Sequence, residues 1–234
     1  MRPRSLPPPP DPGQAATRAL LLEAAGEVFA EVGFRAATVR AICQRAGVNI
    51  AAVNYHFGDK ERLYVEVLRH SHEKALAQYP MDLGAPARAT PAERLRAFVR
   101  SLLLRMLANG PMAWHGKLLA LEMIEPTRAL DTLVQEHFQP MARLLRQILR
   151  SLLGAAAGPE LERLCGCSIV SQCLFYQHCR SVVARMFPDQ RFGPADLERL
   201  ADHITRFSLA GLRAFAAQAT SRRRRHRKRA APKR

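Results

Sequence analysis

The residues best suited to contact another molecule are concentrated in one short stretch, residues 38–60, which reads TVRAICQRAGVNIAAVNYHFGDK. Its first half predicts a short helix that Thr38 caps, with apolar residues toward the core and polar residues outward. Gly47 permits a tight turn, and Asn49 caps a second short helix. This order predicts a helix-turn-helix unit, in which the second helix enters the major groove of DNA by its N-terminal end.

The second short helix combines apolar anchors with small and polar side chains. Ile50, Val53 and Phe57 are spaced to pack inward on one face. Small residues at Ala51 and Ala52 would let the helix come close to another surface. The spacing therefore favours a helix that packs on its own domain through one face and contacts another molecule through the other.

Helical patterns also dominate the elements that must position this unit, from residue 17 to residue 218. An amphipathic helix is expected over residues 17–32, where Gly33 stops it, and a longer helix over residues 60–78. Prolines and glycines between residues 80 and 86 break the pattern and predict a domain boundary. We therefore expect a proline-rich disordered arm over residues 1–13 and a first domain over residues 14–78.

A second, larger domain is expected over residues 88–219. Thr90-Pro91-Ala92-Glu93 predicts its first helix, because it combines an N-cap threonine, proline at the first position and a capping-box glutamate. Further helices are expected over residues 112–124, 127–153, 160–187 and 195–218. Strand-like alternation and fixed-period repeats are absent from the sequence, so the predicted fold class is all-α: a three-helix N-terminal domain plus a larger C-terminal helical domain.

The net charge of +16 is unevenly distributed over the 234 residues. Residues 222–234 carry nine basic residues and no acidic one, whereas residues 17–74 carry eight basic and seven acidic residues. The tail over residues 220–234 is expected to be disordered. Either it follows nucleic-acid phosphates without sequence preference, or it is a solvated run of charge.

Composition and spacing argue against several other classes of protein. No apolar run approaches the roughly 20 residues of a spanning helix, and the start lacks a secretory signal, so we expect a cytoplasmic protein without membrane association. The five cysteines are odd in number, and Cys165-Gly-Cys167 has the wrong spacing for structural zinc. Glu-x-x-His pairs, a phosphate-binding loop and a nucleophile elbow are all missing from the sequence. We expect no enzyme activity, no cofactor and no metal.

Residues 17–74 resemble the DNA-binding domain of TetR-family transcriptional regulators. The resemblance is carried by Thr38, Ala46-Gly47-Val48, His56-Phe57 and Lys60, preceded by Phe29 and Gly33-Phe34. Asn54 departs from the family pattern, because an aromatic residue usually stands two positions before the histidine. The wording of the second helix, with a long helical second domain, is similar to the CecR-like branch of the family.

The resemblance implies a dimer that binds a double-stranded, palindromic DNA operator as a repressor. Phosphate contacts are implied for Thr38, Tyr55, His56 and Lys60, and base-edge reading for residues 49–54. An amide such as Asn54 can pair with adenine, and the methyl group of an alanine can meet thymine. The full set of expected DNA-binding residues is Thr38, Arg40, Asn49, Ile50, Ala51, Ala52, Asn54, Tyr55, His56 and Lys60. The alternative for Tyr55 and His56 is simple packing on the adjoining helix.

The second domain is expected to hold the dimer interface and a small-molecule effector. The last two predicted helices carry small residues that permit close helix packing, either with a second copy of the chain or within one chain. The other helices mix polar or aromatic residues with apolar ones, as the wall of a ligand pocket does. The expected pocket residues are Met106, Trp114, His115, Glu122, Met123, Phe138, Gln172 and Tyr176. The competing hypothesis for the whole chain is a nonspecific binder of nucleic acid or anionic surfaces, driven by the basic tail.

Overall fold

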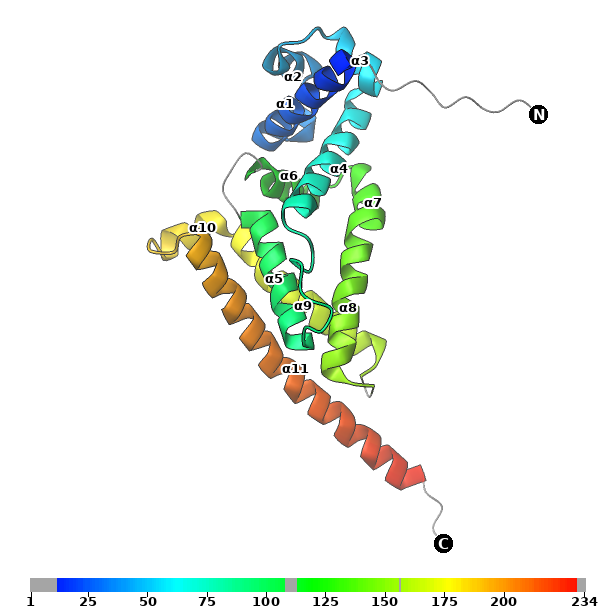
Figure 1. Cartoon of the computed structure of the whole chain (residues 1–234). Coiled ribbons are helices and arrows are strands. Elements are labelled where there is room, and N and C mark those ends of the chain that lie inside the picture. The colour runs from blue at the N-terminus through cyan, green and yellow to red at the C-terminus, as the bar shows by residue number, and fades with distance from the viewer. Residues whose placement is uncertain (1–11, 108–112, 156, 231–234) are drawn as a thin grey trace, which may run out of the picture.

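The structure is a computed structural model that describes residues 12–107, 113–155 and 157–230. Every regular element in these ranges is a helix, so the predicted all-α class is confirmed. The elements are α1 (Pro12–Ala36), α2 (Val39–Ala46), α3 (Ala51–Phe57), α4 (Lys60–Gln78), α5 (Pro91–Leu107), α6 (Ala113–Ile124), α7 (Ala129–Leu133), the π-helix η1 (Val134–Phe138), α8 (Gln139–Leu153), α9 (Pro159–His178), α10 (Arg180–Met186) and α11 (Pro194–Ala230). None of these described helices is long and apolar enough to cross a bilayer. The first helices form a head at one end of the molecule, and the later ones form a body beneath it (Figure 1).

The head is built around one apolar core that all of its helices share. Leu21 and Phe29 of α1, Val53 of α3 and Leu63 of α4 are all fully buried there. Tyr64 of α4 meets Phe29 edge to face, with ring centroids 4.8 Å apart. Helices as short as α2 and α3 are not stable alone. Their orientation is therefore set by the side chains that they insert into this common core.

α1 is longer than the helix expected over residues 17–32. It begins at Pro12. Proline is well suited to the first turn of a helix, because the N–H groups of that turn have no partner in the helix and the one that proline lacks is not missed. The expected disordered arm over residues 1–13 thus overlaps the start of α1, and residues 1–11 lie outside the described part of the chain. At the other end Gly33, with φ of 77°, leaves the helical path as predicted.

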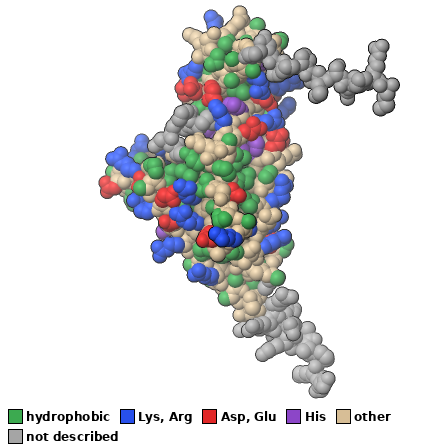
Figure 2. Space-filling model, in the orientation of Figure 1, with side chains coloured by type: hydrophobic (Ala, Val, Ile, Leu, Met, Phe, Trp, Pro, Cys, Tyr) green, Lys and Arg blue, Asp and Glu red, His purple; other side chains and the backbone are tan. Residues whose placement is uncertain are grey.

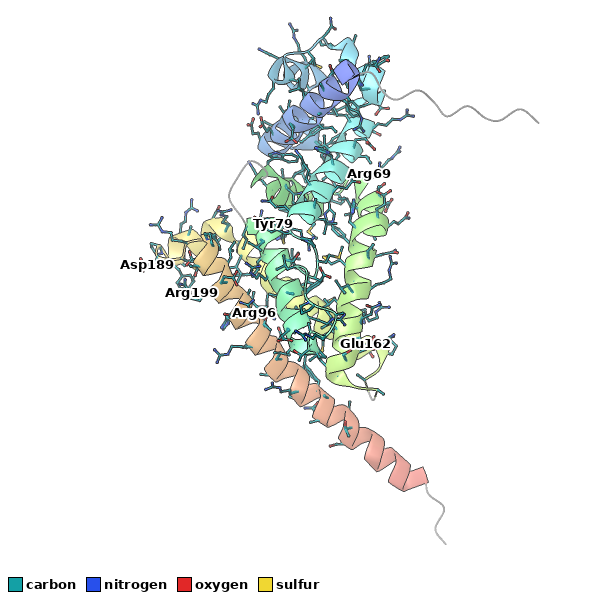
Figure 3. All side chains as sticks on the ribbon, viewed as in Figure 1. Arg69, Tyr79, Arg96, Glu162, Asp189 and Arg199 are labelled. Atoms are coloured by element: carbon teal, nitrogen blue, oxygen red, sulfur yellow. The ribbon has the colours of Figure 1, made fainter. Side chains whose placement is uncertain are left out.

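The body contains a second core formed by α5, α8, α9 and α11. The predicted capping box at its start is confirmed: the backbone N–H and the hydroxyl of Thr90 both donate to Glu93, at 2.7 and 2.8 Å. Arg96 of α5 (Figure 3) donates to Asp202 of α11 at 2.6 Å and to Glu198 of the same helix at 3.0 Å. These partly exposed ion pairs contribute little energy each, but they align α11 along α5.

The body helices are more interrupted than the sequence pattern predicted. The single helix expected over residues 127–153 is divided into α7, η1 and α8, because Pro140 has no N–H group for the carbonyl four residues earlier. The chain adopts a π turn just before it, in which Gln139 donates to the carbonyl of Val134. The helix expected over residues 160–187 is likewise divided at Cys179 into α9 and α10.

α6 and α7 lie within the second domain expected from the sequence but pack on the head. Leu118 of α6 and Leu133 of α7 lie in the same core as Phe29. Trp114 of α6 presses on α1 at Gly26, where an added Cβ would lie 2.5 Å from the indole ring. The break expected between residues 78 and 88 is therefore a break between helices, while the packing of the head continues across it.

A buried carboxylate stabilises the contact between the head and α6. Glu122 of α6 has no exposed surface, and its oxygens accept hydrogen bonds from the Tyr64 hydroxyl at 2.8 Å and from the Thr127 backbone N–H at 2.8 Å. The hydroxyl of Thr127 donates to it as well, at 3.0 Å. Burial, followed by the bond to Glu122, raises the pKa of Tyr64 above its ordinary value. The contact joins α4 of the head to α6 and to the start of α7.

The expected disordered tail is wrong for residues 220–230, because α11 continues as a helix through Ala230. Arginine, lysine and alanine are good helix formers, and extending an existing helix costs much less than starting one. Residues 231–234 of the expected tail lie outside the described residues. Figure 1 places this end of α11 at the opposite end of the molecule from α2 and α3.

Replacing Tyr64 by phenylalanine should destabilise the protein by about 1.5 to 3 kcal/mol, because a buried carboxylate would lose one of its donors. The measurement is the free energy of unfolding in urea. Tyr79→Phe is the matched control, since among the described residues the Tyr79 hydroxyl takes part only in an exposed bond from Gln78. Equal losses in the two variants would contradict the role given to Glu122.

Candidate nucleic-acid interface

The turn between α2 and α3 has the geometry that the sequence predicted. Thr38 caps α2 by accepting from the backbone N–H of Ala41 at 3.1 Å. Gly47 ends that helix in the left-handed conformation, with φ of 67° and ψ of 30°, which residues with a side chain rarely adopt. Val48 then donates to the carbonyl of Cys43 at 3.0 Å. These local bonds fix the direction in which α3 leaves the turn.

α3 is buried on one side and open on the other. Val53 and Phe57 enter the core, whereas Ile50 is 49% exposed, so the expectation that Ile50 packs inward is wrong. The reason is its position: it precedes the first residue of α3 and lies outside the face that Val53 and Phe57 define. The N-cap position of α3 is Ile50, which makes no side-chain cap bond, and not Asn49 as predicted. Asn49 lies one residue earlier, where its Oδ1 accepts from the backbone N–H of Ala51 at 2.9 Å.

The open side of α3 carries the polar groups proposed to read DNA. Asn54 is exposed, and among the described residues its amide has no hydrogen-bond partner. Tyr55 is 69% exposed and meets His56 edge to face, with ring centroids 5.0 Å apart. His56 is half-buried, and Ala51 is exposed while Ala52 is partly covered. The surface therefore offers an amide, a phenol hydroxyl and small methyl groups along one helix.

Lys60 does not point outward in the way that a phosphate contact would require. Its ammonium donates to the carbonyls of Phe34 and Ala37, both at 2.9 Å, and approaches the carbonyl of Arg35 at 3.5 Å. It also lies 4.5 Å from the centre of the Phe34 ring. All three N–H groups of the ammonium thus have partners inside the head. Lys60, the first residue of α4, therefore fixes the end of α1 against α4 through these hydrogen bonds.

The remaining cations of the head differ in their availability. Arg45 makes two hydrogen bonds to Glu31, at 2.6 and 2.9 Å, so an acidic side chain already balances its charge. Arg40 is exposed, and Arg35 is exposed with only a 4.0 Å pair to Glu125. The charges of Arg40 and Arg35 are therefore more available than that of Arg45 to meet phosphates.

The eight expected pocket residues are not gathered around one cavity. Met106 is core, Trp114 packs on α1, Glu122 fastens the head, and Met123 is exposed. The other four are divided among separate sites: His115 bonds Ser71, Phe138 packs on the head core, Gln172 lines a groove between α9 and α11, and Tyr176 meets Phe192. Amphipathic patterns marked these residues as inward-facing but could not tell which neighbours they would meet.

A cluster of buried polar side chains, which the sequence analysis did not assemble, lies where α4 meets the body. It consists of His72, Arg105, His115 and His137, each 7% exposed or less. The ring of His72 lies 4.1 Å from that of His137 and 5.8 Å from that of His115. Burial lowers the pKa of His72 to about 2 and that of His115 to about 4, so both rings are neutral. The only signal in the sequence was one charged residue, Arg105, within the apolar run 102–107.

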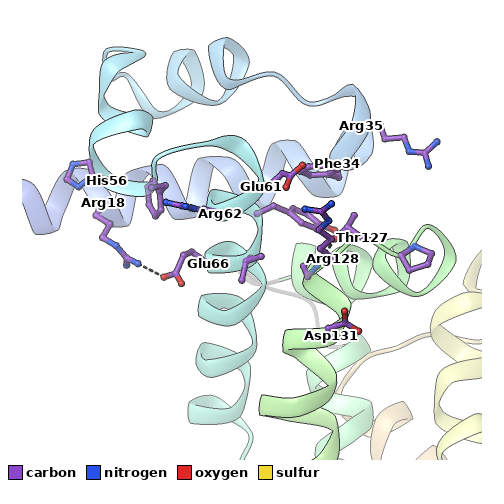
Figure 4. Close-up of a pocket in the computed structure, with 15 residues that line it drawn as sticks. Arg18, Phe34, Arg35, His56, Glu61, Arg62, Glu66, Thr127, Arg128 and Asp131 are labelled. Carbon is purple, nitrogen blue, oxygen red and sulfur yellow. Dashed lines mark hydrogen bonds and ion pairs between the residues drawn. The ribbon is translucent and has the colours of Figure 1, made fainter.

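Two of the surface hollows in the described part of the chain have walls suited to contacts with other molecules. One, of about 1010 Å³, lies between the head and residues 126–131, and charged side chains such as Arg18, Glu66 and Asp131 line much of it (Figure 4). The other is the groove between α9 and α11, of about 290 Å³, whose walls are mostly apolar and include Phe207 at 66% exposure. Hydrophobic side chains also gather across the middle of the body in Figure 2. Exposed apolar surface of this kind is typical of interaction sites.

Two family models match the chain. Residues 21–67 match the model described as "Bacterial regulatory proteins, tetR family", which covers the α2–α3 unit and most of the head. Residues 91–212 match the model described as "HTH-type transcriptional dual regulator CecR, C-terminal domain". The two matches together span the head and nearly all of the body.

Individual transcriptional regulators are similar to this chain over most of their length. The HTH-type transcriptional dual regulator CecR of Shigella flexneri is 32% identical over 162 residues, which cover 62% of this chain and 68% of that protein. The HTH-type transcriptional repressor NicS of Pseudomonas putida is 27% identical over 207 residues, covering 84% and 91%. A crystal structure of a putative transcriptional regulator from Pseudomonas aeruginosa PAO1 matches the fold with a TM-score of 0.65, at 22% identity, over 88% of this chain and 96% of that one.

Replacing Lys60 by methionine should lower the free energy of unfolding by about 1 to 3 kcal/mol, because the carbonyls at the end of α1 would lose their donor. Urea denaturation measures the loss, and the exposed Lys117→Met of α6 is the control. Unchanged stability combined with weaker binding to DNA would instead support the phosphate contact that the sequence suggested.

Proposed function

Starting from the fact that the chain belongs to the TetR family of bacterial transcriptional regulators, we propose that it is a dimeric repressor that binds a palindromic operator and is released by a small molecule. The observation that carries the proposal is the open side of α3. That side presents Asn54 and Tyr55 to solvent, while Val53 and Phe57 anchor the opposite side in the head core. A helix held in this way can enter a major groove as a rigid element.

The α3 surface divides into groups that position the protein and groups that read bases. Tyr55 and Thr38 carry hydroxyls suited to phosphate oxygens, and such contacts set register without reading sequence. Asn54 carries the amide that pairs with adenine through two hydrogen bonds, and Ala51 offers a methyl group to thymine. Arg40 adds a cation that no acidic side chain of the described residues balances.

Changing Asn54 to alanine should alter which bases are preferred, whereas changing Tyr55 to phenylalanine should weaken binding to every duplex by a similar factor. The expected loss of discrimination at the affected base pair is about 1 to 3 kcal/mol. Selection from a random duplex library identifies the operator, and gel-shift titrations on operator and scrambled DNA then compare the variants. Gln147→Ala, an exposed amide on α8, is the control.

The same titrations separate the proposed function from a tail-driven binder. A chain that ends at Thr220 should keep its preference for the operator and show a flatter dependence on salt, because it lacks nine phosphate-binding cations. Loss of operator preference in that shortened chain, or equal effects of the Asn54 and Tyr55 changes on all DNA, would favour nonspecific binding through the tail.

The dimer is proposed because one recognition helix contacts too few base pairs to select an operator alone. A single helix-turn-helix unit covers only a few base pairs, so two units about 34 to 36 Å apart must act together. The groove between α9 and α11 supports a second copy as its occupant, since Leu164, Phe207 and Phe215 are 51%, 66% and 43% exposed. Gly211 and Ser168 in the same groove permit close approach of helices.

Replacing Phe207 by glutamate should convert the dimer to a monomer and weaken operator binding at least tenfold, because a charge would be buried in an apolar interface. Sedimentation analysis measures the mass, and gel shift measures the binding. Phe187→Glu is the control, since Phe187 is 57% exposed at the end of α10 and does not line the groove. A wild-type monomer, or a dimeric Phe207→Glu variant, would contradict this interface.

Release by an effector requires that the effector prefers a dimer whose heads are wrongly spaced for DNA. The route that supports such coupling is short. α4 carries Lys60 and Tyr64 in the head and His72 at the body, and α6 and α7 pack directly on the head core. A change in packing around the lower half of α4 would therefore reach α3 through elements already in contact.

A further inference from the structure

Arg105 is a buried charge that has no counter-ion among the described residues. It lies on α5 with 7% of its surface exposed, and its only hydrogen bond among the described residues runs from Nη2 to the sulfur of Met141 at 3.8 Å. Its Nε has no partner in the described part of the chain. A sulfur atom is a weak acceptor and carries no charge. The guanidinium is therefore desolvated without the oxygen partners that normally accompany a buried arginine.

Among the described residues, no carboxylate forms an ion pair with Arg105. The described ion pairs of aspartate and glutamate are made with other cations, as Glu136 is held by Arg69, and the charge of Glu73 raises the pKa of His137 and of Arg69 but not that of Arg105. The residues that connect α5 to α6, residues 108–112, include no aspartate or glutamate. Burial lowers the pKa of Arg105 only to about 10, so the guanidinium keeps its positive charge at neutral pH.

Neutral hydrogen-bonding groups lie near this charge, because Arg105 lowers the pKa of both His72 and His115, and the ring of His137 lies beside that of His72. Both ring nitrogens of His72 and the Nε2 of His137 lack partners among the described residues, while His115 bonds the Ser71 hydroxyl at 3.0 Å. A neutral imidazole has one donor and one acceptor, so these rings can donate to an oxyanion without adding a charge. His137 belongs to the π-helix η1, and interruptions of this kind frequently occur at functional sites.

We propose that Arg105 and the histidines of this cluster form the effector site, and that the effector is an organic carboxylate whose single negative charge neutralises the guanidinium. An arginine binds a carboxylate through two parallel hydrogen bonds, and His72 and His137 can supply further donors. One charge balances one charge, whereas a phosphate dianion would leave an unpaired negative charge in the body core. A metal cation is disfavoured by the positive charge of Arg105. The proposal rests on the proposed function for its effect on DNA, but not for the binding itself.

The site also explains how binding would reach the head. His72 and Ser71 lie on α4, the helix that carries Tyr64 and Lys60 at its other end. Ser71 bonds His115 of α6, which packs on the head core through Leu118. A carboxylate drawn to Arg105 would compete for the rings around it and shift α4 against α6.

The test compares Arg105→Met and Arg105→Lys with wild type, and uses Arg100→Met as the control because Arg100 lies on the same helix but is paired with Glu198. The probes are benzoate and octanoate, their neutral amides, and inorganic phosphate, and the readout is the midpoint of thermal unfolding. Without probe, Arg105→Met should melt about 2 to 4 °C higher than wild type, since it removes an uncompensated charge. Arg100→Met should melt at or slightly below the wild-type temperature.

With probe, a carboxylate should raise the midpoint of wild type more than its amide does, and that difference should vanish in Arg105→Met and be reduced in Arg105→Lys. The proposal is overturned if Arg105→Met melts below wild type, as a truncated core residue would, or if amides or phosphate stabilise as well as carboxylates. Operator titrations on the same samples separate the two proposals. A wild-type protein that binds carboxylate through Arg105 but shows no operator preference would contradict the proposed function alone.

Discussion

The buried carboxylate of Glu122 fixes the relation between the two halves of the molecule. It is fully enclosed and is satisfied by donors from two sides, the Tyr64 hydroxyl of α4 and the backbone and side chain of Thr127. A carboxylate in such a place tolerates the loss of a donor poorly, so α4 can take few positions against α6. The direction in which α3 faces away from the body depends on this contact, because α3 and α4 share one core.

α4 links three sites that would otherwise be separate. Lys60 at its first residue holds the end of α1, Tyr64 one turn later meets Glu122, and His72 two turns beyond lies in the buried histidine cluster. At 1.5 Å per residue, Lys60 and His72 are about 18 Å apart along one straight element. A helix transmits a displacement over this distance without needing a chain of small rearrangements, provided that the body has two packings of similar free energy.

Structural features that are decided within a few residues could be predicted from the sequence. Features that depend on partners far away in the chain could not. Thr38, Gly47 and Thr90 were predicted correctly because a cap or a left-handed turn is decided within about four residues. The contacts of Lys60 inside the head were not foreseen, because one partner, the carbonyl of Phe34, is 26 residues away and all backbone carbonyls look alike in a sequence. Arg105 was visible as a lone charge among leucines, but the absence of a counter-ion is a property of the packed body.

The charge of the chain has a different meaning once these contacts are known. Of the cations in the head, Arg45 is balanced by Glu31 and Lys60 is occupied by carbonyls, whereas Arg40 and Arg35 stay exposed, and the proposed reading of sequence is assigned to uncharged groups such as Asn54. Nine of the sixteen excess charges belong to residues 222–234, and α11 carries most of them away from the head. Attraction to phosphates depends on salt but not on sequence, whereas base-edge hydrogen bonds depend on sequence and little on salt. Under the proposed function, strength of attraction and choice of site are therefore governed from opposite ends of the molecule, and each can change without altering the other.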